Sequence, residues 1–311
     1  MHPLSLASQN PPAATNHLYK IAARVLLLLF LACITTTPTT RAEEPKQITA
    51  ATASSITTST NSPWNRIIMI GASASAGFVE SEPLGGPLTP KCRLSRYLDA
   101  ALVAPHDPIT NLATALFFLQ PEVEGRRQII LALKSQPTLL VGVDFLFWYC
   151  YGEGTDEERA ARFERGLKLL ETVSCPIILG DIPDVAGASI SMLDPVQIPG
   201  PRALAAANRR LKEWAASRPQ VSVLSLSGFM SAAKANRALT IHGDTLPDGK
   251  TAILLQSDRL HPSPPGCAVL AVAILDTFQQ THPQPVISEV HWNPKEVFHL
   301  VIPASPVPTP K

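Results

Sequence analysis

The strongest constraint on the fold of this chain is the alternation, after residue 66, of short apolar runs with longer segments that carry apolar residues at helical spacing. An apolar run of four to eight residues between turn residues is typical of a buried strand. Such strands in alternation with helices predict a parallel sheet covered on both faces. We therefore expect an α/β fold, a three-layer α/β/α sandwich around a central parallel sheet. The expected strands are 66–70, 138–143, 175–180 and 221–226, and the expected helices are 93–102, 122–134, 157–171, 201–217 and 266–280.

Two local signals support the helix predictions. Thr155 and Glu158 have the spacing of a capping box, in which each side chain satisfies a backbone N–H at the start of a helix. Pro201 suits the first turn of the next helix, because the first N–H groups of a helix have no partner within it. In an open parallel sheet, ligands sit beyond the carboxyl ends of the strands. Functional residues are therefore expected in the segments that follow the strands.

The N-terminal segment has the pattern of an export signal. Lys20 and Arg24 precede the apolar run 25–32, which is too short to span a bilayer, and Ala42 offers a small residue for cleavage. We expect residues 1–42 to be a signal peptide and the mature chain to be exported, periplasmic or secreted. Cys33 leaves a lipoprotein as the less favoured alternative, and an uncleaved signal anchor is another.

The rest of the chain divides into three parts by composition. Residues 43–62 are rich in Ser, Thr and Ala without apolar periodicity, which predicts a flexible linker. Residues 63–280 hold the alternating elements and are expected to form the folded domain. Residues 281–311 are rich in proline and are expected to be a C-terminal extension.

Charge and cysteine content exclude several classes of function. The net charge is +1 and only 16% of residues are charged, so no basic field favours nucleic acid. There is no C-x-x-C motif and no histidine-rich cluster, so no metal site is predicted. Export would leave four cysteines, and an oxidising compartment permits up to two disulfides in any of three pairings: Cys92, Cys150, Cys175 and Cys267.

The stretch GASASAGF, residues 71–78, directly follows the first expected strand. Small residues there permit a tight strand-to-helix turn, which by itself requires no chemistry. Alternatively, Ser73 or Ser75 is a nucleophile, which would need a base elsewhere in the chain.

The stretch SDRLHPSPPG, residues 257–266, directly precedes the last expected helix. Asp258 and His261 are three residues apart, a spacing that can place the carboxylate beside the imidazole. A loop histidine near a surface aspartate is the simpler interpretation of this pair alone. The serine stretch and this pair lie at sheet ends that are expected to meet.

Taken together, these stretches resemble the SGNH (GDSL) hydrolase family of esterases and lipases. Gly71-Ala72-Ser73 is similar to the family's Gly-Asp-Ser, with Ala72 in place of the aspartate. Asp258, His261 and the following Pro-x-x-x-Gly are similar to its late Asp-x-x-His block. The resemblance covers roughly residues 64–280 and implies the flavodoxin-like SGNH fold, with residues 63–280 as an SGNH hydrolase-like catalytic domain. It also implies a triad of Ser73 as nucleophile, His261 as base and Asp258 as the residue that orients His261.

The middle of the chain departs from this family. Its oxyanion hole uses the N–H of the nucleophile, a glycine N–H and an asparagine side chain. Here Asn111-Leu112-Ala113 stands for Asn-x-Gly, and Asp144 occupies the place of the asparagine. An ionised carboxylate cannot donate a hydrogen bond, and loss of one donor typically lowers the rate by about 10²–10³. Either Asp144 is protonated and donates, or another group donates, or the activity is weak.

Two further groups of residues have structural or functional interpretations. The aromatic run 144–152 would line a substrate pocket or pack in the core. Asp181 and Asp184 follow another strand and would contact substrate or cap a loop, the cap being favoured.

The sequence thus predicts an exported serine hydrolase that cleaves carboxylic esters through an acyl-enzyme, with no cofactor and no metal. Its substrate would be a small ester, a lipid or an acylated glycan, and no obligate protein partner is implied. The alternative is a degenerate domain of the same fold that binds a glycan or lipid without turnover, which the aspartate at position 144 favours.

Overall fold

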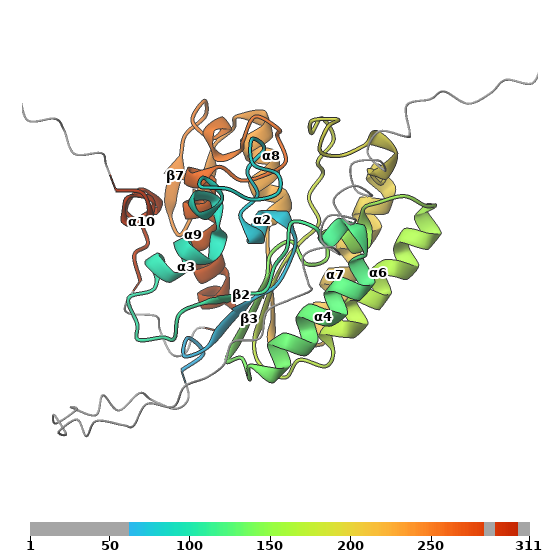
Figure 1. Ribbon diagram of the computed structural model, residues 1–311, viewed down its shortest axis with the longest axis horizontal. Helices are drawn as coiled ribbons and strands as arrows, with labels where there is room; N and C mark the ends of the chain where they lie inside the picture. Colours follow the sequence, from blue (N-terminus) through green and yellow to red (C-terminus); the bar gives the residue numbers. More distant parts are fainter. Residues whose placement is uncertain (1–61, 283–289, 304–311) are drawn as a thin grey trace, which may run out of the picture. The chain divides into compact units, whose positions relative to one another are not determined.

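The computed structural model describes residues 62–282 and 290–303. The signal peptide and nearly all of the linker expected from the sequence lie outside these ranges. The described chain has a five-stranded parallel sheet at its centre, with strand order β2-β1-β3-β4-β5 (Figure 1). This is the order of flavodoxin-like, doubly wound folds. The strands are β1 (Ile67–Met69), β2 (Thr110–Asn111), β3 (Leu139–Gly142), β4 (Ile177–Gly180) and β5 (Val221–Leu224).

Helices cover both faces of the sheet, so the three-layer prediction is confirmed (Figure 1). One layer holds α3 (Leu94–Ala101) and α9 (Pro264–Thr281). The other holds α4 (Pro121–Lys134), α6 (Asp156–Leu170) and α7 (Pro201–Ala216). The four strands and five helices expected from the sequence are all present, each shifted by at most two residues at either end. The capping box of Thr155 and Glu158 is also present.

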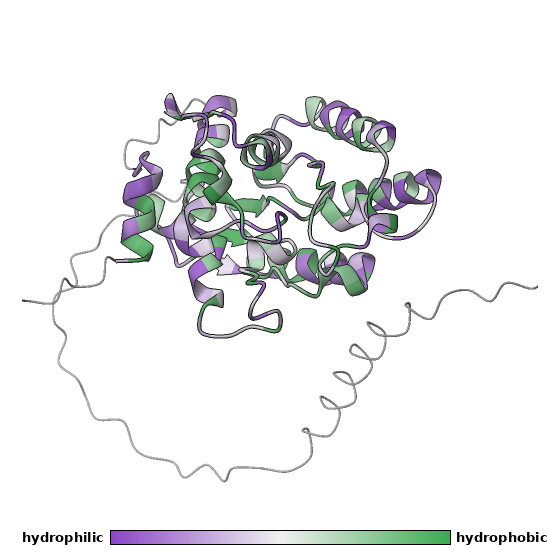
Figure 2. Cartoon of the chain, turned by 90° about the horizontal axis from the view of Figure 1, so that it is seen from above, coloured by the Kyte–Doolittle hydropathy of each residue, from purple (hydrophilic) through white to green (hydrophobic). Residues whose placement is uncertain are grey.

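The core lies between the sheet and these two layers. Every residue of β1, β3 and β4 is buried, as the central strands of a parallel sheet must be when both faces are covered. Apolar residues gather on the strands and inner helix faces, and polar residues on the outer helix faces (Figure 2). Among the described residues, no helix combines the length and hydrophobicity needed to cross a bilayer.

The structure adds elements that the sequence did not predict. Five are short helices or strands, and two helices are longer. The C-terminal helix, within the predicted extension, packs against α9 and α3, with Val297 fully buried. The added α-helices and strands are α2 (Ser73–Ala76), α5 (Phe147–Cys150), α8 (Leu226–Ala235), α10 (Pro294–Val301), the edge strand β2 and the hairpin β6 (Leu239–Ile241)–β7 (Asp244–Leu246).

Candidate active site

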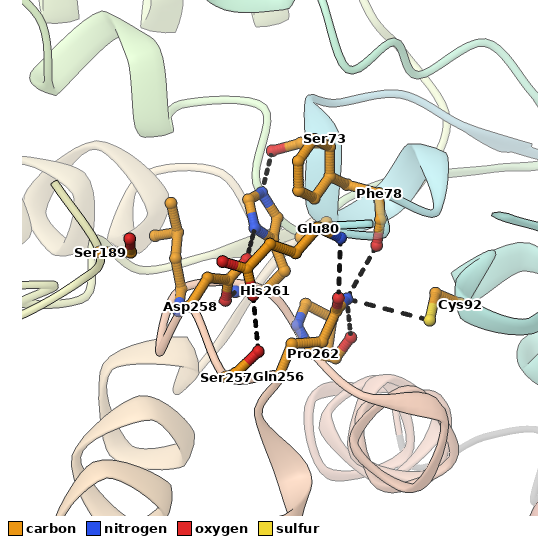
Figure 3. Close-up of polar contacts among 12 residues, drawn as sticks. Ser73, Phe78, Glu80, Cys92, Ser189, Gln256, Ser257, Asp258, His261 and Pro262 are labelled. Carbon is orange, nitrogen blue, oxygen red and sulfur yellow. Dashed lines mark hydrogen bonds and ion pairs between the residues drawn. The ribbon is translucent and has the colours of Figure 1, made fainter. Parts of the chain in front are cut away.

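The fold brings Ser73 and His261 into contact, although 188 residues separate them in the sequence. Ser73 is the first residue of α2, which follows β1 after the short turn 70–72, and His261 lies in the loop before α9. The Ser73 Oγ is 2.8 Å from Nε2 of His261. The Nδ1 atom of the same imidazole is 2.7 Å from Oδ2 of Asp258 (Figure 3). The three side chains thus form the continuous chain of hydrogen bonds that a serine nucleophile and its base require.

Asp258 is held in its ionised form. Its side chain is fully buried, and burial alone would raise the pKa of the carboxyl. The hydrogen bond and charge of His261, with the N–H groups of His261 and Leu260 donating to Oδ1, outweigh burial and hold the pKa below its ordinary value. An ionised Asp258 accepts from Nδ1–H, which leaves Nε2 free to accept the proton of Ser73.

The segment 71–77, which carries Ser73 and is called the nucleophile turn below, has a glycine at each end that allows its conformation. Gly77 ends α2 with a φ of 95°, in the left-handed region, and a Cβ there would lie 2.8 Å from the Cα of Arg93. A Cβ on Gly71, whose φ is 144°, would lie 2.1 Å from a carboxylate oxygen of Asp144. Both positions therefore require a residue without a side chain.

Asp144 lies beneath the nucleophile turn and accepts hydrogen bonds from it. Its Oδ1 accepts from the N–H of Ala72 at 3.0 Å and from the hydroxyl of Ser75 at 2.6 Å. Its Oδ2 accepts from the N–H groups of Ala74 at 2.8 Å and Ser75 at 3.2 Å. The expectation that a protonated Asp144 donates to an oxyanion is therefore wrong for this geometry, because both oxygens face backbone donors.

The same contacts distinguish the two serines. Ser75 is fully buried and its hydroxyl donates to Asp144, away from His261. The backbone N–H groups of residues 72, 74 and 75 donate to Asp144, whereas no hydrogen bond joins the N–H of Ser73 to another described residue. That unpaired N–H belongs to the residue whose hydroxyl contacts the imidazole.

Asn111 and Ala113 differ from the expectation that they line an oxyanion hole. The side-chain NH₂ of Asn111 donates to the carbonyl of Ser75 at 2.9 Å and to the hydroxyl of Ser95 at 3.2 Å. Its side-chain oxygen accepts from the N–H of Ala113 at 3.0 Å. Asn111 thus supports the backbone of the nucleophile helix, and the donor groups of both residues are already engaged.

The other sequence candidates have structural roles. Phe145, Tyr149 and Tyr151 of the aromatic run are fully buried, which favours core packing over a substrate pocket. Asp181 accepts from the N–H and hydroxyl of Ser227 at the start of α8, and Asp184 accepts from the N–H of Ala186, so the cap interpretation holds for both.

Metal and disulfide sites can be assessed for the described residues alone. Within them, no cluster of three His, Cys, Asp or Glu side chains could hold a metal ion. Four cysteines are thiols there: Cys92, Cys150, Cys175 and Cys267. Burial raises the pKa of Cys175 to about 11 and that of Cys150 to about 12, so neither is a reactive thiolate near neutral pH.

Sequence comparisons give no relative, whereas structure comparisons give distant ones. No protein-family model matches the chain, and a search of curated proteins finds no match. Solved structures similar to it include a gut microbial diltiazem-metabolizing enzyme (TM-score 0.44, 14% identity). The match covers 68% of this chain and 46% of the length of that enzyme, so this chain spans about half of it.

Two other similar structures are matched over most of their length. One is the psychrotrophic esterase EstA from Pseudoalteromonas sp., with a TM-score of 0.43, 14% identity, and coverage of 70% of this chain and 97% of EstA. The other is a GDSL-like lipase from Bacteroides thetaiotaomicron, with a TM-score of 0.43, 11% identity, and coverage of 70% of this chain and 88% of the lipase. The likeness is one of fold.

Proposed function

We propose that this protein is a serine hydrolase that cleaves carboxylic esters through an acyl-enzyme. The hydrogen-bonded chain Ser73–His261–Asp258 carries the proposal. It combines a nucleophile, a base within 2.8 Å of it, and a buried carboxylate that fixes the tautomer of the base. The esterase EstA and the GDSL-like lipase, although distant, are consistent with this reaction class.

The residues have the following roles in the proposed mechanism. Oγ of Ser73 attacks the ester carbonyl carbon as Nε2 of His261 takes the hydroxyl proton. Asp258 stabilises the resulting imidazolium, and the free N–H of Ser73 donates to the developing oxyanion. The tetrahedral intermediate collapses, the C–O bond to the alcohol breaks, and His261 returns the proton to the departing alkoxide. A water activated by His261 then hydrolyses the acyl-enzyme and restores Ser73.

A binding domain without turnover is the second candidate. The observation that favours it is that Asn111, Ala113 and Asp144 leave no free donor at the positions expected for an oxyanion hole. In that case the protein would hold an acylated glycan or a lipid at the same edge of the sheet, and the serine would not be acylated.

Hydrolysis of a short-chain aryl ester distinguishes the two candidates. The hydrolase proposal predicts turnover by the wild-type protein and its loss in Ser73→Ala and His261→Ala. Ser75→Ala is the matched serine variant and should keep measurable turnover, because its hydroxyl does not contact the base. Turnover lost in Ser75→Ala but kept in Ser73→Ala would contradict the assignment of the nucleophile. Absence of turnover in folded wild-type protein would favour the binding domain.

Export is part of the proposal and rests on the sequence of residues 1–42. Cleavage after Ala42 would place the enzyme outside the cytoplasm as a free protein. A lipid on Cys33 would instead hold it at a membrane surface. N-terminal sequencing and intact mass of protein produced with its leader test this, and an unprocessed Met1 would contradict cleavage.

A further inference from the structure

Gln256 joins the two segments that carry the nucleophile and the base. Its side-chain NH₂ donates to the carbonyl of Phe78 at 2.8 Å and to the carbonyl of Pro262 at 3.0 Å. Its side-chain oxygen accepts from the N–H of Glu80 at 3.2 Å. Figure 3 shows the amide between the chain that leaves the nucleophile helix and the loop that holds His261.

The backbone of Gln256 is fixed to the same loop. Its N–H donates to the carbonyl of His261 at 2.9 Å, and its carbonyl accepts from the N–H of Arg259 at 3.0 Å. The side chain therefore extends from a loop of defined geometry and reaches across to residues 78–80. No other described side chain bonds both to residues 78–80 and to the backbone that follows His261.

Phe78, whose carbonyl accepts from Gln256, also contacts the base His261 through its ring. Its ring stacks on the imidazole of His261, with the ring centroids 4.1 Å apart and the planes at 29°. The stacked ring limits rotation of the imidazole and covers one of its faces. A shift of Phe78 would therefore change both the orientation and the surroundings of the base.

We infer that Gln256 is a positioning residue that holds Phe78 against His261 and so sets the geometry between His261 and Ser73. The inference rests on the proposed function. An amide suits this task because the site offers two carbonyl acceptors, the Sγ of Cys92 at 3.9 Å and one N–H donor, and an amide has both an NH₂ that donates and an oxygen that accepts. A glutamate of the same shape could accept from Glu80 but could not donate to Phe78 or Pro262.

The test measures the rate of covalent labelling by a fluorophosphonate and the kcat and KM for a short-chain aryl ester. Gln256→Glu, Gln256→Ala, Phe78→Leu and the double variant Gln256→Ala/Phe78→Leu are compared with wild type. Ser257→Ala is the control, because its hydroxyl bonds to the side chain of Glu80 at the exposed edge of the same contact. Thermal unfolding of each variant sets an assay temperature at which all are folded.

The expected result is a loss of about tenfold to a hundredfold in labelling rate and kcat for Gln256→Glu and Gln256→Ala, with KM little changed. Ser257→Ala should stay near wild type. Because Gln256 acts through Phe78, the double variant should lose no more than the more impaired single variant. Wild-type rates in Gln256→Glu, or losses that multiply in the double variant, would overturn the inference alone. Absence of labelling and turnover in folded wild type would overturn the proposed function and the inference with it.

Discussion

Asp144→Asn tests whether Asp144 supports the nucleophile turn or donates to the oxyanion. The carboxylate accepts hydrogen bonds from three backbone N–H groups and from the hydroxyl of Ser75. An asparagine keeps the shape but has only one acceptor oxygen. If its NH₂ takes the place of Oδ2, the N–H groups of Ala74 and Ser75 lose their acceptor.

The opposite orientation of the asparagine amide costs less stability. With the NH₂ at Oδ1, the hydroxyl of Ser75 can rotate to accept, and only the buried N–H of Ala72 loses its partner. One unsatisfied buried N–H costs about 1–3 kcal/mol, and the remaining bonds lose the added strength of a charged acceptor. We therefore expect Asp144→Asn to lower the free energy of unfolding by about 2–4 kcal/mol.

Activity should fall as well, because α2 carries Ser73. Displacement of the nucleophile turn by a fraction of an ångström should reduce kcat/KM by about tenfold or more. Urea unfolding followed by circular dichroism gives the stability, and aryl ester hydrolysis gives kcat/KM. Ser75→Ala is the matched variant, because it removes one bond to Asp144 and retains the carboxylate. A stable Asp144→Asn variant that hydrolyses ester faster than wild type would show that the side chain at position 144 donates to the oxyanion and does not only support the turn.

Two further predictions concern the triad and the turn. The pKa of Asp258 is lower in the folded protein than its unfolded value of about 3.9. Ionisation of Asp258 therefore stabilises the fold fully above the unfolded pKa, and this contribution is lost as the pH falls through the folded pKa. The free energy of unfolding of wild type should therefore exceed that of Asp258→Asn near neutral pH, and the difference should shrink below about pH 3.9. A difference that stays the same in acid would contradict the ionised state of Asp258 in the folded protein. Gly77→Ala should lower unfolding free energy by about 1–3 kcal/mol and slow fluorophosphonate labelling, because its φ of 95° and the Arg93 backbone exclude a Cβ. A variant as stable and reactive as wild type would show that the turn tolerates another conformation.

The sequence predicted the buried strands well because their apolar runs are bounded by turn residues. It also placed Ser73, Asp258 and His261 at sheet ends that meet, since the carboxyl ends of parallel strands share one edge. The edge strand β2 was missed, because two polar residues, Thr110 and Asn111, carry no periodic signal.

Helix α8 was missed for a different reason. Its first residue, Leu226, is the last residue of the apolar run 221–226 that predicts a strand, and the capping residue Ser225 lies within the same run. The helix is held by the side chain of Asp181, which bonds to Ser227 from 46 residues away. A contact of that separation cannot be inferred from local pattern.

The roles of Asp144 and Asn111 depend on the orientation of their side chains, which cannot be predicted from their positions in the sequence. Asp144 does lie beside the nucleophile, as its place after β3 predicted. Its oxygens turn toward the backbone of α2 because Gly71 leaves room for them and the N-terminus of that short helix needs acceptors. Gln256 had no motif to mark it, and only its contacts with Phe78 and Pro262 reveal it.

The most direct test of the proposed active site is to identify the serine that a phosphonate inhibitor modifies. Folded wild-type protein would be treated with a fluorophosphonate, digested, and its peptides analysed by mass spectrometry. The expected result is one phosphonyl group per chain, bound to Oγ of Ser73, and none in His261→Ala. Modification of Ser75, or no modification of folded protein, would contradict the claim that Ser73, His261 and Asp258 form a working nucleophile and base.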